Sequence, residues 1–275
     1  MRPMREPRYG AFLLLFLGLT ATPEARAQAD YRNLAPGRPI TIEDAQPVEF
    51  RALELEFGVP RFTRERHGVW VLGFEPEFKA GIARDWQFGI SSELVVAREE
   101  DDTISSFRDT QFHLLYNFNQ ESRRWPAFSL RPELTIRGGA LGSQHEHGAL
   151  KVIMSKTLHR NRVHFNGSYT VGPTEAEGRG GELVNRFLYG AAYERTFPLH
   201  FVVLLGDVYA RKPIDHGPTE VVFDVGTRVQ LNPMWVLDAG VSSGVLRHSV
   251  GPDISFTFGL SYTFSFRSLF PTGAP

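Results

Sequence analysis

The sequence contains no cysteine and only four methionines among its 275 residues. The lack of cysteine excludes disulfide scaffolds, cysteine-ligated zinc sites and thiol catalysis. No stretch reaches the roughly 18 consecutive apolar residues that a transmembrane helix needs. The 30 basic and 31 acidic residues nearly cancel, which argues against a nucleic-acid-binding protein, because such proteins usually present a basic face.

The N-terminal residues have the pattern of a secretory signal peptide. Three arginines fall within residues 2–8, an apolar run covers residues 11–19, and residues 25–27 (Ala-Arg-Ala) offer a small-x-small cleavage site. The apolar run is too short to span a membrane as a helix. We therefore expect residues 1–27 to be a signal peptide, and its bacterial type indicates export to the periplasm or beyond.

The rest of the chain alternates apolar and polar residues with a period of two. Between Ile254 and Phe266 every second residue is apolar, with small polar residues or glycine between them. An amphipathic helix has a period of about 3.6, so this alternation predicts a β-strand. Residues 201–210 are apolar on both faces, which leaves their inward positions open. The pattern predicts twelve strands: residues 53–59, 70–78, 86–96, 112–118, 128–136, 150–154, 163–171, 187–193, 201–210, 221–231, 235–241 and 254–266.

Short connections alternate with longer, charged or glycine-rich ones. The short ones are residues 79–85, 119–126, 158–162, 195–200 and 232–234, and the longer ones are residues 97–107, 138–148, 172–182, 211–218 and 243–252. This rhythm is typical of bacterial outer-membrane barrels, which have short periplasmic turns and longer outer loops. We predict an all-β fold: one transmembrane antiparallel β-barrel of about 12 strands, an up-and-down meander over residues 50–266, with residues 267–275 as a tail.

A soluble β-sandwich or lipocalin-like barrel is the alternative, because parity alone does not tell the inside of a barrel from the outside. Twelve strands exceed the usual soluble barrel. Tryptophan and tyrosine residues also fall near the predicted strand ends, where interfacial girdles lie. Both observations favour the membrane barrel. The mean hydropathy of −0.22 fits it as well, since only every second residue would face lipid.

Charged side chains occupy the strand face opposite the apolar stripe. They are either selective groups in a polar pore or paired charges that fill the lumen, and the sequence favours neither. Residues 28–49 are likewise either a periplasmic lead-in or a short plug inside the barrel. The candidate pore-lining residues are Glu75, Glu77, His113, Arg131, Glu133, Arg137, His164, Glu194, Asp224, Arg228 and Asp238.

Four short segments resemble a known family. They are residues 38–45 (RPITIEDA), 78–89 (FKAGIARDWQFG), 226–233 (GTRVQLNP) and 237–240 (LDAG). In them the chain resembles the outer-membrane barrel family labelled "MetA-pathway of phenol degradation", over nearly all of residues 38–266. The resemblance implies a transport channel for small compounds, aromatic or hydrophobic ones among them.

Two motifs look catalytic or metal-binding but lack the required context. Residues 240–244 match G-x-S-x-G, yet that motif needs a strand-turn-helix in an α/β sheet. His145 and His147 fall in a predicted loop rather than at helical spacing, and no third ligand accompanies them. We therefore expect no enzyme activity, no catalytic residue, no bound metal and no cofactor.

Two functions remain open from the sequence: a transport channel, or a closed barrel that serves a structural or loop-mediated binding role. In both, the expected partners are outer-membrane lipid and, during biogenesis, the barrel-assembly machinery. The channel also has a small-molecule solute whose identity the sequence does not give. The expected location is the outer membrane of a Gram-negative cell.

Overall fold

The predicted alternation folds into strands throughout the computed structural model, which describes residues 32–58, 61–65, 70–99, 102–173, 184–196, 198–199, 201–214, 218–245 and 252–265. The expected signal peptide, the first residues of the 28–49 segment, Phe266 and the expected tail lie outside these described residues. Within them, no helix is long and apolar enough to span a membrane.

The described chain contains fourteen strand segments. They are β1 (Leu53–Gly58), β2 (Arg61–Glu65), β3 (Trp70–Phe74), β4 (Glu77–Ala83), β5 (Trp86–Glu99), β6 (Asp102–Asn119), β7 (Ala127–Ile136), β8 (His147–Leu158), β9 (Asn161–Val171), β10 (Arg186–Arg195), β11 (Val202–Pro213), β12 (Glu220–Asn232), β13 (Trp235–Gly244) and β14 (Pro252–Phe264). β1 and β2 both pair with β14, and β3 and β4 both pair with β5, so each couple is one interrupted barrel strand. The described segments therefore make twelve barrel strands, and the prediction is confirmed.

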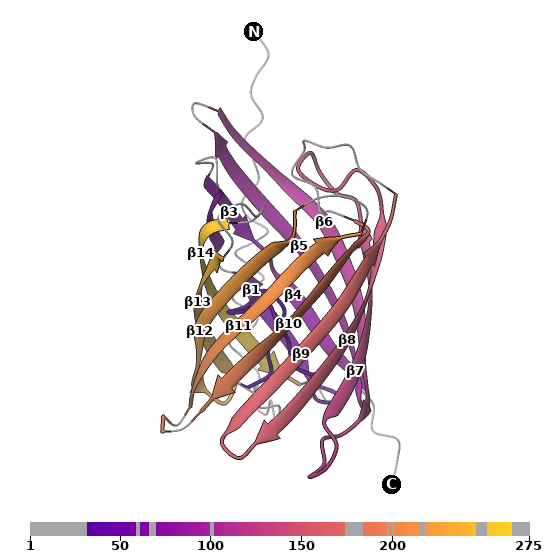
Figure 1. Cartoon of the computed structure of the whole chain (residues 1–275), viewed down its shortest axis with the longest axis vertical. Coiled ribbons are helices and arrows are strands. Elements are labelled where there is room, and N and C mark those ends of the chain that lie inside the picture. The colour runs from indigo at the N-terminus through magenta and orange to yellow at the C-terminus, as the bar shows by residue number, and fades with distance from the viewer. Residues whose placement is uncertain are drawn as a thin grey trace.

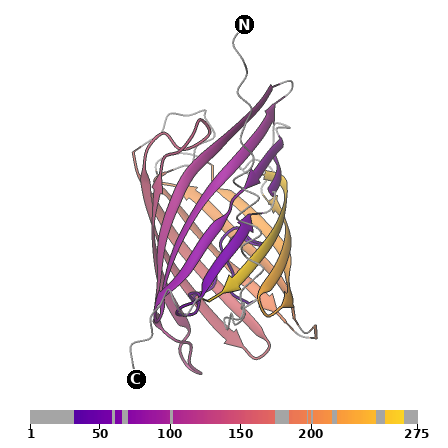
Figure 2. The same ribbon diagram turned by 180° about the vertical axis from the view of Figure 1, so that it is seen from behind.

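All the strand pairings are antiparallel, and consecutive barrel strands are neighbours around the ring (Figure 1). The first barrel strand pairs with the last, for example Leu53 with Phe264 and Phe62 with Phe256. Figure 2 shows this closure, where the yellow β14 lies beside the first strands. Closure leaves no free sheet edge, as a barrel in lipid requires.

Two predicted connections are wrong. Residues 79–83 of the predicted 79–85 turn belong to β4. Residues 97–99 and 102–107 of the predicted 97–107 loop continue the ladder of β5 and β6, with Ala97 opposite Ile104 and Arg98 opposite Thr103. The acidic residues 99–102 suggested a loop, but the flanking threonine, isoleucine and phenylalanine keep the two strands paired. The β5–β6 hairpin consequently projects beyond the other strands at one rim (Figure 1). We call this rim the loop end and the opposite rim, with the tight turns after β4, β8 and β12, the turn end.

The apolar stripe faces outward. Leu150, Val152, Phe223, Val225 and Leu237 are all exposed. Aromatic pairs lie at the turn end of this outer surface, with ring centroids 4.4 Å apart for Trp86 and Tyr116 and 4.5 Å apart for Trp235 and Tyr262. An apolar outer belt with aromatic residues at its border is the surface of a barrel that faces lipid.

Candidate functional site: the barrel lumen

Residues 32–48, which we call the lumenal segment, run through the inside of the barrel. Arg32 forms an ion pair with Glu194 of β10 at 2.9 Å, and Arg38 forms one with Glu56 of β1 at 2.7 Å. The segment then turns toward the turn end, where the Val48 amide donates to Gln87 of β5 at 2.9 Å. These contacts reach opposite sides of the ring, so the segment crosses the lumen.

Side chains of the wall bind the backbone of the lumenal segment. Asp207 of β11 and Asp224 of β12 are opposite each other in the sheet. The Thr41 amide donates to both carboxylates, at 2.9 and 3.0 Å, and the Ile42 amide donates to Asp207 at 2.8 Å. These hydrogen bonds satisfy the backbone amides of Thr41 and Ile42, which have no partner in a strand and would cost free energy if they were buried unpaired.

Apolar residues of the lumenal segment explain the strand that is apolar on both faces. Leu34, Ile40 and Ile42 are buried against an inward patch of the wall that includes Val203, Leu205 and Tyr209 of β11. Leu204 and Val208 of the same strand face outward and are exposed. The structure thus decides which residues of β11 face inward. Both faces of this strand are apolar because its inner face packs against protein rather than water.

Two glycines of the wall are required by a close approach of the lumenal segment. Gly226 and Gly240 are opposite each other on β12 and β13. A Cβ added at Gly240 would lie 2.3 Å from the carbonyl oxygen of Pro39, and one at Gly226 would lie 2.8 Å from the Pro39 ring. This contact accounts for the first glycine of the G-x-S-x-G motif without any catalytic role.

Replacing Gly240 with alanine is therefore expected to destabilise the protein by about 1–3 kcal/mol, the usual cost of overpacking. The comparison is with Gly167→Ala on β9, where nothing lies within 4 Å of an added Cβ. Thermal unfolding in detergent measures both. Equal midpoints for the two variants would show that Pro39 is not seated on this surface.

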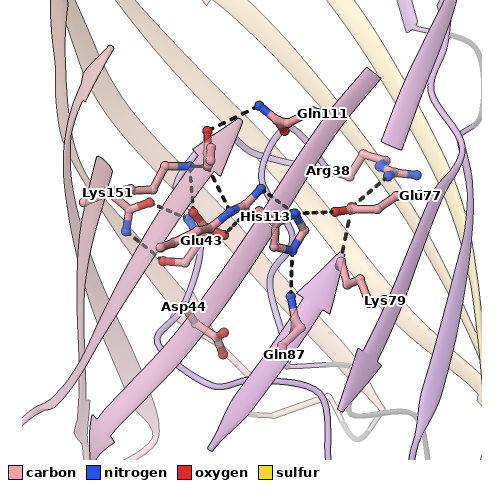
Figure 3. A network of polar contacts seen from close by, with 12 residues as sticks. Arg38, Glu43, Asp44, Glu77, Lys79, Gln87, Gln111, His113 and Lys151 are labelled. Carbon is pink, nitrogen blue, oxygen red and sulfur yellow. Dashed lines mark hydrogen bonds and ion pairs between the residues drawn. The ribbon is translucent and has the colours of Figure 1, made fainter. Parts of the chain in front are cut away.

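A network of buried charges joins the lumenal segment to several barrel strands (Figure 3). Glu43 forms ion pairs with Lys151 of β8, at 2.7 Å, and with Arg131 of β7. Arg131 Nε also contacts Glu133 of β7 at 2.9 Å. On the other side of the network Lys79 of β4 forms ion pairs with the carboxylates of β1 and β4: Glu54, Glu56 and Glu77. Every charge in this network has an opposite charge beside it, so its burial is compensated.

His113 of β6 lies between the two halves of the network (Figure 3). Its Nδ1 is 3.6 Å from Glu77 and 3.3 Å from Arg131, and its Nε2 is 3.1 Å from the side-chain nitrogen of Gln87. A Cβ at Gly89 would lie 2.0 Å from the imidazole ring, so the neighbouring strand must carry glycine there. The histidine is thus a packed structural member of the network.

Glu43 gives the network a pH dependence. Burial raises the pKa of its carboxyl, but the charges of Arg131 and Lys151 outweigh burial and hold the pKa below its ordinary value of 4.5. A carboxyl whose pKa is lowered by folding stabilises the folded state above its unfolded pKa and loses that effect as the pH falls through its folded pKa.

We therefore expect the difference in melting temperature between the wild type and Glu43→Gln to stay constant above about pH 4.5 and to shrink below it. Thermal unfolding over a series of buffers checks this. A difference that grows toward acid pH would contradict the assigned ion pairs.

The structure places most of the candidate pore-lining residues inside the barrel. Eight of them are buried there: Glu77, His113, Arg131, His164, Glu194, Asp224, Arg228 and Asp238. Glu75 and Glu133 are half-buried. Arg137 lies past the last residue of β7 with its side chain exposed, so it does not join the others.

Apart from Asp224, which binds Thr41, the buried candidates outside the Glu43 network form two further groups. His164 is 3.6 Å from Glu194, which also pairs with Arg162 at 3.3 Å. Arg228 is opposite Asp238 in the sheet and donates to the carbonyl of Asn33. Sequence reasoning missed Arg38 and Glu43, because the lumenal segment has no period-two pattern. It also missed Asp207, because its strand is apolar on both faces.

The half of the lumen nearer the loop end holds a cavity of about 830 Å³. Its lining includes Pro36, Pro39 and Thr41 of the lumenal segment, together with residues of many wall strands. The described residues contain no cluster of three or more histidine, aspartate or glutamate side chains that would hold a metal ion. The cavity is thus a polar chamber, and the lumenal segment forms its boundary toward the turn end.

Comparison with protein-family models gives no match, and comparison with curated proteins gives none. Among solved structures, the chain is similar to the "COG4313 outer membrane channel from Pseudomonas putida F1". The TM-score is 0.61 at 12% identity, over 85% of this chain and 100% of that one. The two chains share the barrel fold. Two further structures resemble it less: the "KdgM porin" (TM-score 0.49, 12% identity, 78% of this chain and 99% of that one) and the "CymD monoaromatic hydrocarbon channel" (0.46, 9%, 79% and 89%).

Proposed function

We propose that this chain is an outer-membrane channel that passes small solutes along the barrel axis. The observation that carries the proposal is a polar cavity of about 830 Å³ inside a closed barrel whose outer surface is apolar. The apolar belt suits burial in a membrane, and the polar lumen gives hydrophilic groups a route through it. The resemblance to the "MetA-pathway of phenol degradation" barrels supports the same class of function. The proposed location is the outer membrane. Residues 1–27 would direct export as a signal peptide, and the barrel-assembly machinery would then insert the barrel into the membrane.

In this proposal the lumenal segment is a plug that narrows the turn end of the channel. The plug would comprise most of residues 28–49, which precede the barrel in the sequence. Its hydrogen bonds to Asp207, Asp224 and Gln87 anchor it to strands around the ring. The same contacts support a second candidate function, a barrel that the plug closes completely and that serves a structural role.

Reconstitution into planar lipid bilayers distinguishes the two functions. Steady single-channel openings are expected for the channel, and a folded but electrically silent barrel would support the closed alternative. Folding is checked independently by the shift in gel mobility on heating that membrane barrels show. A protein that remained soluble and lacked this shift would contradict the membrane barrel itself.

A further inference from the structure

The charged residues that line the cavity near the loop end are unevenly distributed around the ring. Six are basic and six are acidic among the described residues. The strands from β7 to β11 carry one of the acidic residues, Glu133, and four of the basic ones: Arg131, Lys151, Arg186 and Arg211. The rest of the lining has two basic and five acidic residues. We call β7 to β11 the basic wall, and it is the side of the cavity where an anion would bind.

Two of the four basic residues already have counter-charges in the Glu43 network. Lys151 lies 2.7 Å from Glu43 and 3.4 Å from Glu133, and Arg131 also contacts both carboxylates. These two positive charges are therefore balanced by two negative ones. Any excess of positive charge on the basic wall comes from the two arginines of β10 and β11.

Arg186 and Arg211 together carry more positive charge than the acidic residue beside them. Arg211 lies 3.2 Å from Glu220 of β12, and its side chain is 30% exposed. Arg186 is half-buried and lines the same cavity. The formal sum over these two arginines and Glu220 is one positive charge. This local excess suits a ligand with one negative charge.

The sheet register brings the two arginines within reach of one small ligand. Arg186 of β10 is opposite Pro213 of β11, so Arg211 is its diagonal neighbour on the adjacent strand. Diagonal neighbours on one face of a sheet have side chains that start about 7–8 Å apart. An arginine side chain is long enough to bridge this separation. Both guanidinium groups can therefore contact the same carboxylate, and no group on the far wall is needed.

The residues around the two arginines add hydrogen-bond donors and an apolar contact. Thr170 of β9 is opposite Arg186, and Ser168 of β9 is opposite Leu188 of β10. Leu188 is also opposite Arg211, so it is the apolar side chain between the two arginines. The Arg211 guanidinium lies 5.0 Å from the centre of the Tyr209 ring, which helps to hold it in place. All of these residues line the cavity.

We propose that Arg186 and Arg211 form a binding site for small monocarboxylates with an apolar body. The inference rests on the proposed channel function and names a class of solute for it. The two guanidinium groups donate charge-assisted hydrogen bonds to the carboxylate, as arginine commonly does. The Thr170 hydroxyl donates to the same group, and the apolar body lies against Leu188. A ligand with two negative charges would exceed the local positive charge and be repelled by Glu220.

Isothermal titration calorimetry of benzoate into the full mature chain in detergent tests the site. Benzoate should bind at one site, and benzamide, which has a similar shape and no charge, should bind at least about tenfold more weakly. Arg186→Gln and Arg211→Gln should each lower the affinity for benzoate at least about tenfold, because each removes a hydrogen bond between charged groups. Heat-modifiable gel mobility confirms that each variant is folded.

Arg108→Gln is the matched control. It removes one positive charge from the same cavity, but Arg108 is on β6, outside the basic wall. Most of the affinity for benzoate should remain. An equal loss in Arg108→Gln and Arg186→Gln would overturn the site, since the charge of the whole cavity would then control binding. Benzamide binding as tightly as benzoate would also overturn it.

Inorganic phosphate distinguishes a carboxylate site from a general anion site, and tighter binding of phosphate than of benzoate would overturn the assigned ligand class. Calorimetry needs no transport, so the site and the channel can fail separately. A protein that conducts but does not bind benzoate loses the site and keeps the channel. A protein that binds benzoate but is electrically silent in bilayers keeps the site and loses the channel.

Discussion

Deletion of residues 33–47 is expected to raise single-channel conductance several-fold. The lumenal segment occupies the cross-section between the cavity and the turn end, where it packs through Ile40 and Ile42 on one side and bonds to Gln87 on the other. The barrel should still fold, because its twelve strands pair with each other and not with this segment. The charged wall residues that lose partners, such as Asp207 and Arg131, would face water in the widened lumen and be solvated there. Conductance in planar bilayers measures the effect, and heat-modifiable gel mobility confirms folding.

A milder variant tests the same expectation through a smaller increase in conductance. Glu43→Gln combined with Asp44→Asn removes the ion pairs to Arg131, Lys151 and Arg162 but leaves the apolar anchor and the backbone hydrogen bonds in place. Its conductance should lie between that of the wild type and that of the deletion, with frequent fluctuation between levels. If the deletion variant folds and conducts no better than the wild type, the lumenal segment does not obstruct the pathway.

Arg131→Met is expected to lower the free energy of unfolding by about 3 kcal/mol, the lower end of the cost of breaking a buried ion pair from one side. The arginine is 1% exposed and contacts Glu43 and Glu133. After its removal Lys151 is the basic side chain that pairs with both carboxylates, so two negative charges share one positive charge. Urea unfolding in lipid vesicles, followed by tryptophan fluorescence, gives the value.

The double variant Arg131→Met with Glu43→Gln separates charge burial from packing. It removes the uncompensated carboxylate, so part of the lost stability should return, as a double-mutant cycle would reveal. Arg137→Met is the control, because this arginine is exposed beyond β7 and changes at exposed positions usually fall within about 0.5 kcal/mol. If the double variant is as unstable as the sum of the two single ones, the ion pair does not couple the lumenal segment to the wall.

The wall of the barrel could be predicted from the sequence because alternate residues of a strand point to opposite faces of the sheet. Glu77, His113 and Arg131 were placed on the polar face by parity alone, and all three are buried inside the barrel. The prediction failed at residues 97–107, where local charge suggested a loop. There the cross-strand pairing of Ala97 with Ile104 decides the structure, and such pairing is not visible in either strand alone.

The partners of the inward charges depend on contacts between distant parts of the chain. Thr41 meets Asp224 across 183 residues and Glu43 meets Asn166 across 123. No local pattern encodes such distances, and the lumenal segment has no periodicity that would indicate a strand or helix. Whether residues 28–49 lie below the barrel or inside it was therefore open in the sequence.

The sequence by itself determined the strand count and the division of each strand into an apolar and a polar face, because the period of two is a property of the local backbone. The absence of cysteine and of a long apolar run is consistent with the same barrel. Only the tertiary structure decided that residues 32–48 fill part of the lumen, that the apolar face points outward and that β5 is across the ring from β11. Closure of the ring fixes which strands are opposite each other, and that relation exists only once the first barrel strand has paired with the last.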